Sequence, residues 1–200
     1  MCTAPSDDEL IRRFQQERDY AAFEELFARH KDLLLRYLLR LVRDIALAED
    51  ASQQAWLKVI EVARRNTYTS HATATFRTWL FTLARNHVID AHQRNRVVSR
   101  TVSLPNEVIH ELLDSNLDSV SLDPAAKALE SELTERVMAA MDLLPFEQRE
   151  VITLWTIGFD PHEIANIAGV PRETIFSRKK YGIAKLRVAL ADLLRARRLT

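Results

Sequence analysis

Cysteine is nearly absent from this chain of 200 residues, in which Cys2 is the only one. A single cysteine cannot form an intrachain disulfide, and so few cysteines are typical of a reducing compartment. The chain also lacks a run of about 18 apolar residues and an N-terminal segment that is basic and then apolar, so neither a membrane span nor a signal peptide is expected. These absences predict a cytoplasmic protein.

Glycine is scarce as well, with three residues, and no run of alternating β-branched residues predicts a strand. Ala, Leu, Glu, Arg and Gln are abundant, and all of them favour helices. Hydrophobic residues make up 47% of the chain, which is enough to build one medium core or two small ones. We therefore expect an all-α fold.

Patterns of residues suited to catalysis are missing too. The histidines show no metal-ligand spacing, since His162-Glu163 is followed by Asn166 where a zinc-binding helix needs a second histidine. The chain contains no glycine-rich phosphate loop and no serine elbow. The sequence thus predicts no catalytic residue, no metal, no cofactor and no small-molecule substrate.

The formal net charge is +0, yet charges of opposite sign are concentrated in different segments. Residues 102–124 contain acidic side chains and no Lys or Arg, whereas Lys and Arg dominate residues 172–200. The acidic stretch is rich in serine and lacks helical periodicity, as a linker does. We predict two small helical domains, residues 1–97 and 125–200, joined by a flexible acidic linker over residues 98–124.

Local signals mark the helices of the first domain, which we expect to number about four. Asp19 and Thr75 are suited to N-capping, and the polar segment 66–75 predicts a loop. The helix that follows, from Phe76 to about Asn95, has an apolar stripe at helical spacing. Its aromatic side chains are better explained by core packing than by base stacking; they are Phe76, Trp79 and Phe81.

A helix-turn-helix pattern occupies the last quarter of the chain. Asp160-Pro161-His162-Glu163 predicts a capping box with proline in the first turn, and Gly169 is placed to end this short helix. A second helix from about Arg172 presents short polar and cationic side chains, as a helix that enters a DNA major groove does. DNA is therefore the first expected partner.

Four segments, in this order, resemble the extracytoplasmic-function sigma factors, small bacterial transcription initiation factors. They are FEELFARHKDLLLRYLLRLV, AEDASQQAWLKV, FRTWLFTLARNHVIDAHQRNR and LLPFEQREVITL, the last followed by the helix-turn-helix. The resemblance implies a factor that binds core RNA polymerase through its β and β′ subunits and promoter DNA at the minus-ten and minus-thirty-five elements. It also implies a possible anti-sigma factor as partner.

The resemblance assigns roles to individual residues of this sequence. Core polymerase binding is expected at Asp50, Gln53, Gln54 and Trp56; minus-ten binding, with capture of a flipped base, at Arg77, Arg85, Asn86, Asp90 and Arg94; and minus-thirty-five binding at Arg172, Thr174, Phe176, Ser177, Arg178 and Lys180. The chain departs from the family pattern at two positions of the second helix. Phe176 replaces a basic residue and Lys179 an apolar one, so Phe176 is open to two interpretations, a contact with DNA or packing on the preceding helix.

Physical chemistry supports these roles unevenly. Asn86 can both donate to and accept from an unpaired base. Such a residue is more often an ordinary solvent-exposed side chain, but the arginines around Asn86 favour a contact with DNA. The alternative function is a free-standing helix-turn-helix regulator whose first half senses a ligand or dimerises. In the free protein, we expect the acidic linker to fold over one of the basic DNA-reading surfaces.

Overall fold

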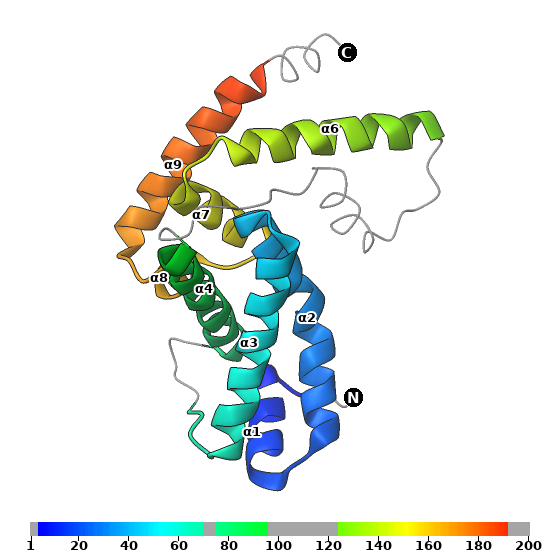
Figure 1. Ribbon diagram of the computed structural model, residues 1–200, viewed down its shortest axis with the longest axis vertical. Helices are drawn as coiled ribbons and strands as arrows, with labels where there is room; N and C mark the ends of the chain where they lie inside the picture. The colour runs from blue at the N-terminus through cyan, green and yellow to red at the C-terminus, as the bar shows by residue number, and fades with distance from the viewer. Residues whose placement is uncertain (1–3, 70–74, 96–123, 192–200) are drawn as a thin grey trace.

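The computed structural model describes residues 4–69, 75–95 and 124–191, and every regular element in these ranges is an α-helix. The predicted all-α fold is confirmed for this part of the chain, in which no helix is long and apolar enough to cross a membrane. Figure 1 shows α1 at one end of the molecule and α6 and α9 at the other. In chain order the helices are α1 (Asp7–Glu17), α2 (Tyr20–Val42), α3 (Ile45–Arg64), α4 (Phe76–Asn95), α6 (Pro124–Asp142), α7 (Phe146–Thr156), α8 (Pro161–Ala168) and α9 (Arg172–Ala189).

Helices α1 to α4 pack together as an N-terminal unit. Two of them begin at aspartates whose carboxylates accept a backbone N–H, Asp19 from Ala22 at 3.2 Å and Asp44 from Leu47 at 3.0 Å. The hydroxyl of Thr75 caps α4 in the same way through Thr78, at 3.2 Å, as the sequence predicts. The buried faces of these helices form one core, and Phe76 and Phe81 are fully buried within it.

The short helix α1 is fastened to α2 by a polar cluster around Asp7. The Asp7 carboxylate contacts His30 Nε2 at 2.6 Å and accepts from Arg29 Nη1 at 3.0 Å. The hydrogen bond with His30 is the largest cause of a lowered Asp7 pKa, and Arg29 acts in the same direction against the effect of burial. Asp7 also lies in the first turn of α1, where a negative charge is favoured by the helix dipole.

Helices α6 to α9 form a C-terminal unit, in which α7, α8 and α9 contact one another and α6 rests on α9. Asp160 and Glu163 make the predicted capping box at the start of α8, and Gly169 ends that helix with φ of 65°. Gly182 lets α9 approach α7 closely, since a Cβ at this position would lie 2.6 Å from Ile152 Cδ1. The result is a helix-turn-helix whose second helix packs against α7.

The two units are in contact with each other. Helix α7 packs on α2, and α8 packs on α4, so that α7 and α8 lie between α9 and the N-terminal unit (Figure 1). The predicted linker, residues 98–124, falls almost entirely outside the described residues. Among the described residues, helices make the contact between the units, α2 with α7 and α4 with α8.

We predict that Asp7→Asn lowers the free energy of unfolding at neutral pH by roughly 1.5 kcal/mol, the lower end for hydrogen bonds to a charged group. Because the Asp7 pKa is lowered on folding, its contribution is present above the unfolded-state pKa of about 3.9 and is lost as the pH falls through the folded-state value. Urea unfolding from pH 7 to pH 3 would measure this difference. A gap between variant and wild type that stays constant over that range would contradict the prediction.

Candidate nucleic-acid interface

The N-terminal half of α9 carries an exposed polar and cationic face. Arg172, Ser177 and Lys180 are exposed, and the Ser177 hydroxyl donates to the Glu173 carbonyl within the helix at 3.0 Å. The capping box fixes where α8 begins, and the αL residue Gly169 ends it. Together they set the direction in which the chain enters α9. Such a face can contact phosphates and base edges in a major groove.

Phe176 combines both interpretations that the sequence leaves open. Its ring is 44% exposed, yet it also meets the Trp155 ring edge to face, with the centroids 6.4 Å apart. The Arg172 guanidinium lies over the Phe176 ring, 5.3 Å from its centroid. The ring thus packs on α7 and still presents apolar surface to solvent.

Lys179 lies on the inner side of α9 and not on the exposed face. Its ammonium is 2.9 Å from the centroid of the Trp155 ring, which makes a cation–π contact between α9 and α7. Burial lowers the Lys179 pKa. The departure from an apolar residue is therefore accommodated by an aromatic partner.

Two other residues predicted to bind the minus-thirty-five element are half-buried. Thr174 and Arg178 belong to the side of α9 that carries the buried residues Ile175 and Gly182. Arg178 Nη1 is buried and has no hydrogen-bond partner among the described residues. Its positive charge acts on Glu150 of α7, whose ionised form it favours.

Helix α4 presents only part of its predicted DNA-binding set to solvent. Asn86 and Asp90 are exposed and one turn apart, whereas Arg77 and Arg85 are half-buried. Arg85 contacts Glu150 in an ion pair, and Arg77 donates to the Ile157 carbonyl at 2.7 Å. Both arginines are thus engaged with the C-terminal unit in this structure.

Two predicted parts of the minus-ten site cannot be compared with the structure. The side chain of Arg94 lies outside the described residues, and so do residues 70–74 of the loop before α4. The roles that the sequence predicts for them stay predictions.

The predicted polymerase patch on α3 is only partly a surface. Asp50, Gln53 and Gln54 are exposed, and the Asp50 carboxylate contacts His87 Nε2 of α4 at 2.7 Å. Trp56, included in the predicted patch, is 5% exposed and belongs to the core, where its ring meets Phe27 at 4.9 Å between centroids. The exposed apolar neighbours are Leu57, at 50%, and Phe27, at 37%. A large aromatic side chain next to a polar patch was a misleading signal, because the helical turn places it inward.

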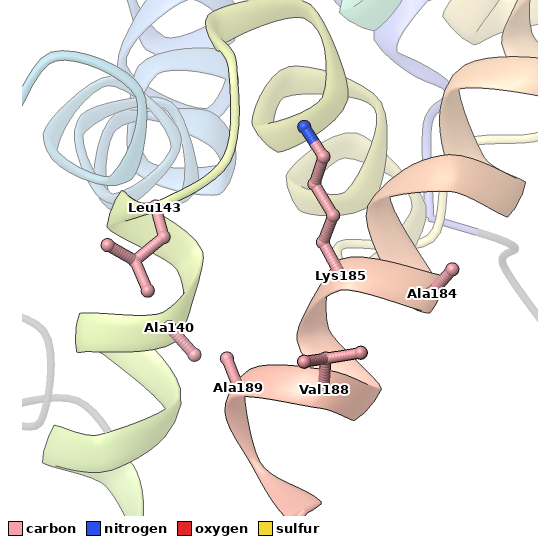
Figure 2. Close-up of a pocket in the computed structure, with 6 residues that line it drawn as sticks. All are labelled: Ala140, Leu143, Ala184, Lys185, Val188 and Ala189. Carbon is pink, nitrogen blue, oxygen red and sulfur yellow. The ribbon is translucent and has the colours of Figure 1, made fainter.

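A second apolar surface lies at the far end of the C-terminal unit. An open groove of about 480 Å³ separates the end of α6 from the C-terminal half of α9. In Figure 2, Ala140 and Leu143 face Val188 and Ala189 across this groove, with Lys185 at its edge. The sequence analysis did not identify this surface, whose residues follow no motif.

Family comparison assigns the two units separately. Residues 26–97 match the model described as Sigma-70 region 2, and residues 140–188 match Sigma-70, region 4. The chain is 31% identical to the RNA polymerase sigma factor CarQ of Myxococcus xanthus, over 86% of this chain and 91% of the relative. It is 30% identical to the ECF RNA polymerase sigma factor SigL of Mycobacterium tuberculosis, over 86% of this chain and 91% of the relative.

Two solved structures share the fold. The sigma factor RpoE of Bartonella quintana, solved in complex with the anti-sigma factor NepR, aligns with a TM-score of 0.61 and 22% identity, over 84% of this chain and 96% of that one. CnrH, solved in complex with the cytosolic domain of CnrY, aligns with a TM-score of 0.62 and 21% identity, over 94% of this chain and 99% of that one. The fold of the described helices is therefore a known one.

We predict that Lys179→Gln destabilises the C-terminal unit by about 0.5–1 kcal/mol, because the cation–π contact with Trp155 is lost. Thermal unfolding followed by tryptophan fluorescence would measure it, since the emission of Trp155 should also change. Lys180→Gln, an exposed neighbour on the same helix, is the matched control and should leave stability unchanged. Equal stability of the two variants would show that Lys179 is not a packing residue.

Proposed function

Because this chain belongs to the extracytoplasmic-function group of the sigma-70 family of RNA polymerase sigma factors, we propose that it binds core RNA polymerase and directs it to promoters. It functions in promoter recognition and transcription initiation. The observation that carries the proposal is the order of two matches on one chain, region 2 over residues 26–97 and region 4 over residues 140–188. A free-standing helix-turn-helix regulator is not favoured, because region 2 occupies the half of the chain where a sensor domain would be.

The proposed division of labour follows the two units. Residues 1–97 bind the polymerase and the minus-ten element, residues 98–124 link the units, and residues 125–200 bind the minus-thirty-five element. Such a factor supplies no catalytic group of its own, and the chemistry belongs to the polymerase. The compartment we propose is the cytoplasm, where bacterial polymerase and promoter DNA are found.

We propose two polymerase contacts of different character. The polar patch of Asp50, Gln53 and Gln54, with Leu57 beside it, suits the β′ subunit because it combines charge with exposed apolar area. The apolar α6–α9 groove suits the β subunit, since the cores of stable interfaces are apolar. The groove uses the C-terminal half of α9, so the DNA face on its N-terminal half stays accessible.

An anti-sigma factor is the further partner that we propose. The sigma factor RpoE was solved in complex with the anti-sigma factor NepR, and CnrH with the cytosolic domain of CnrY. A protein that binds the exposed surfaces of α3 or the α6–α9 groove would compete directly with the polymerase. Regulation by occlusion needs no additional site on this chain.

For the minus-thirty-five element we propose that Arg172 and Lys180 contact phosphate, that Ser177 contacts DNA, and that Phe176 contacts a thymine methyl. The exposed fraction of the Phe176 ring and its fixed position on Trp155 support an apolar contact. Thr174 and Arg178 are half-buried and are therefore assigned a secondary role.

For the minus-ten element we propose the predicted set on α4, with Asn86 as the residue that holds an unpaired base. An amide can donate to and accept from a base edge, and Asn86 is exposed. The set also includes Asp90, Arg94, Arg77 and Arg85. The last two must leave their present partners before they can contact DNA.

We predict that Asp50→Lys combined with Gln53→Ala weakens binding to core polymerase by about tenfold, a loss of roughly 1.4 kcal/mol. Competition with the wild-type protein for purified core polymerase would measure it, with circular dichroism to check helix content. The control is Glu17→Lys with Gln16→Ala, the same chemical changes on the exposed face of α1. If both double variants compete equally well, the α3 patch is not the polymerase contact.

Asn86→Ala should leave polymerase binding unchanged and reduce strand opening, because the captured base loses hydrogen bonds that contribute roughly 1 kcal/mol each. Permanganate reactivity of unpaired thymines in the promoter complex is the measurement. Gln93→Ala, another exposed amide on α4, serves as the control and should open the promoter normally. Reactivity equal to wild type in the Asn86 variant would exclude base capture by this residue.

A further inference from the structure

A row of cationic and aromatic side chains runs from the exposed face of α9 onto α7. The Arg172 guanidinium lies 5.3 Å from the Phe176 centroid, and the Phe176 centroid is 6.4 Å from that of Trp155. At the other end, Lys179 Nζ lies 2.9 Å from the Trp155 centroid. These four side chains form one connected set, which we call the aromatic ladder.

The ladder has an exposed end and a half-buried end. Arg172 and Phe176 are exposed, whereas Trp155 and Lys179 are half-buried. Trp155 belongs to the last turn of α7, the helix that packs on the buried side of α9. A residue outside the helix-turn-helix thus supports a side chain that the helix-turn-helix presents to solvent.

The contact with Trp155 restricts the positions that the Phe176 ring can take. The two rings are inclined by 62°, the edge-to-face arrangement that aromatic pairs prefer. A phenylalanine on an unsupported helix surface exchanges between rotamers, and it loses that freedom when it binds a partner. Because Phe176 is already held by a second ring, it loses less conformational entropy on binding, and its exposed part stays in one place on α9.

Lys179 holds Trp155 in turn. An ammonium over a tryptophan ring is the most favourable of the cation–π pairs. Phe176 and Lys179 are three residues apart, so they are neighbours on one side of α9, and Trp155 contacts both. The two positions at which the second helix departs from the family pattern are therefore parts of one structural change, joined through Trp155.

The positive charge that α9 offers to DNA is limited. Residues 172–180 contain four cationic side chains, and two of them, Arg178 and Lys179, are half-buried. The two exposed cations, Arg172 and Lys180, are accompanied by the exposed carboxylate of Glu173. Cations that contact phosphate supply the part of DNA affinity that does not depend on sequence. Contacts with base edges must therefore contribute a larger share here than on a helix with a basic residue at position 176.

An apolar ring in a major groove has one natural partner, the methyl group of thymine. Cytosine lacks this group, so contact with it distinguishes a T·A pair from a C·G pair. A ring that moves freely can reach several base pairs and selects none of them strongly. A ring held in one place meets one base pair, and selectivity then depends on the residue that holds the ring as well as on the ring itself.

We propose that Trp155, held by Lys179, is a positioning residue for recognition of the minus-thirty-five element. It sets the place of the Phe176 ring and thereby selects thymine at one position of the element, without contacting DNA itself. This role rests on the proposed function, which assigns the minus-thirty-five element to α9 and a thymine methyl to Phe176. Part of the promoter specificity then originates on α7.

Deoxyuridine substitution tests this role, because it removes the thymine methyl and keeps the base pair. The full-length chain, assembled with core polymerase, first selects a fragment from a pool of duplex DNA randomised at both promoter elements. Each thymine of the selected minus-thirty-five element is then replaced in turn. At one position the affinity should fall about fourfold, which corresponds to the burial of one methyl group. The ratio of the affinities for the thymine and deoxyuridine fragments is the methyl ratio.

Trp155→Leu should bring the methyl ratio close to one, and so should Phe176→Ala. Trp155→Phe retains an aromatic ring and should keep most of the wild-type ratio. Added to Phe176→Ala, the change Trp155→Leu should have no further effect, because Trp155 acts through the Phe176 ring. Val151→Ala, which removes buried apolar atoms from the same helix, is the matched control. It should lower stability and leave the methyl ratio at the wild-type value.

A folded Trp155→Leu variant with the wild-type methyl ratio would overturn the proposal, and so would a selected element in which no thymine methyl affects binding. If Trp155→Leu does not fold, Lys179→Met is the second variant, because it removes the charge that holds Trp155. Its methyl ratio should fall, and an unchanged ratio would overturn the proposal as well. If the wild-type holoenzyme selects no minus-thirty-five sequence at all, the proposed function is refuted, and the positioning role with it.

Discussion

The buried pair of Glu150 and Arg85 is the interaction on which the arrangement of this protein depends. A carboxylate with no exposed surface needs an opposite charge and hydrogen bonds, and here both come from the other unit, through Arg85 and Tyr37. The pair fixes which face of α4 is covered. It thereby couples the packing of the helix-turn-helix to the position of Arg85, which belongs to the set that we propose for the minus-ten element.

Some side chains have a role both within one unit and between the two units. Glu163 completes the capping box that starts α8 and also accepts from Thr78 of α4, across the contact between the units. An arginine that binds a carboxylate, as Arg85 does here, also has the chemistry to bind a phosphate.

Much of the fold could be predicted from the sequence because its determinants are local. Asp19, Asp160 with Glu163, and Gly169 act within one helical turn, so their spacing is visible in the chain. Contacts between distant segments were not visible in this way: the partner of Arg85 is 65 residues away. The inward position of Trp56 and the pairing of Lys179 with Trp155 likewise depend on packing. One signal was present, since Glu150 directly precedes the buried stretch Val151–Leu154, where a charge requires a partner.

The most direct test of this account is the distance between the two units of the wild-type chain before and after it joins the polymerase. With Cys2 replaced by serine, donor and acceptor dyes can be attached at Ala28→Cys on α2 and Glu147→Cys on α7, both exposed positions. Single-molecule energy transfer should then show one dominant high-efficiency population in the free protein and a shift to low efficiency in the complex with core polymerase and promoter. The same high efficiency in both states, or a free protein that is already mainly in the low-efficiency state, would contradict the account.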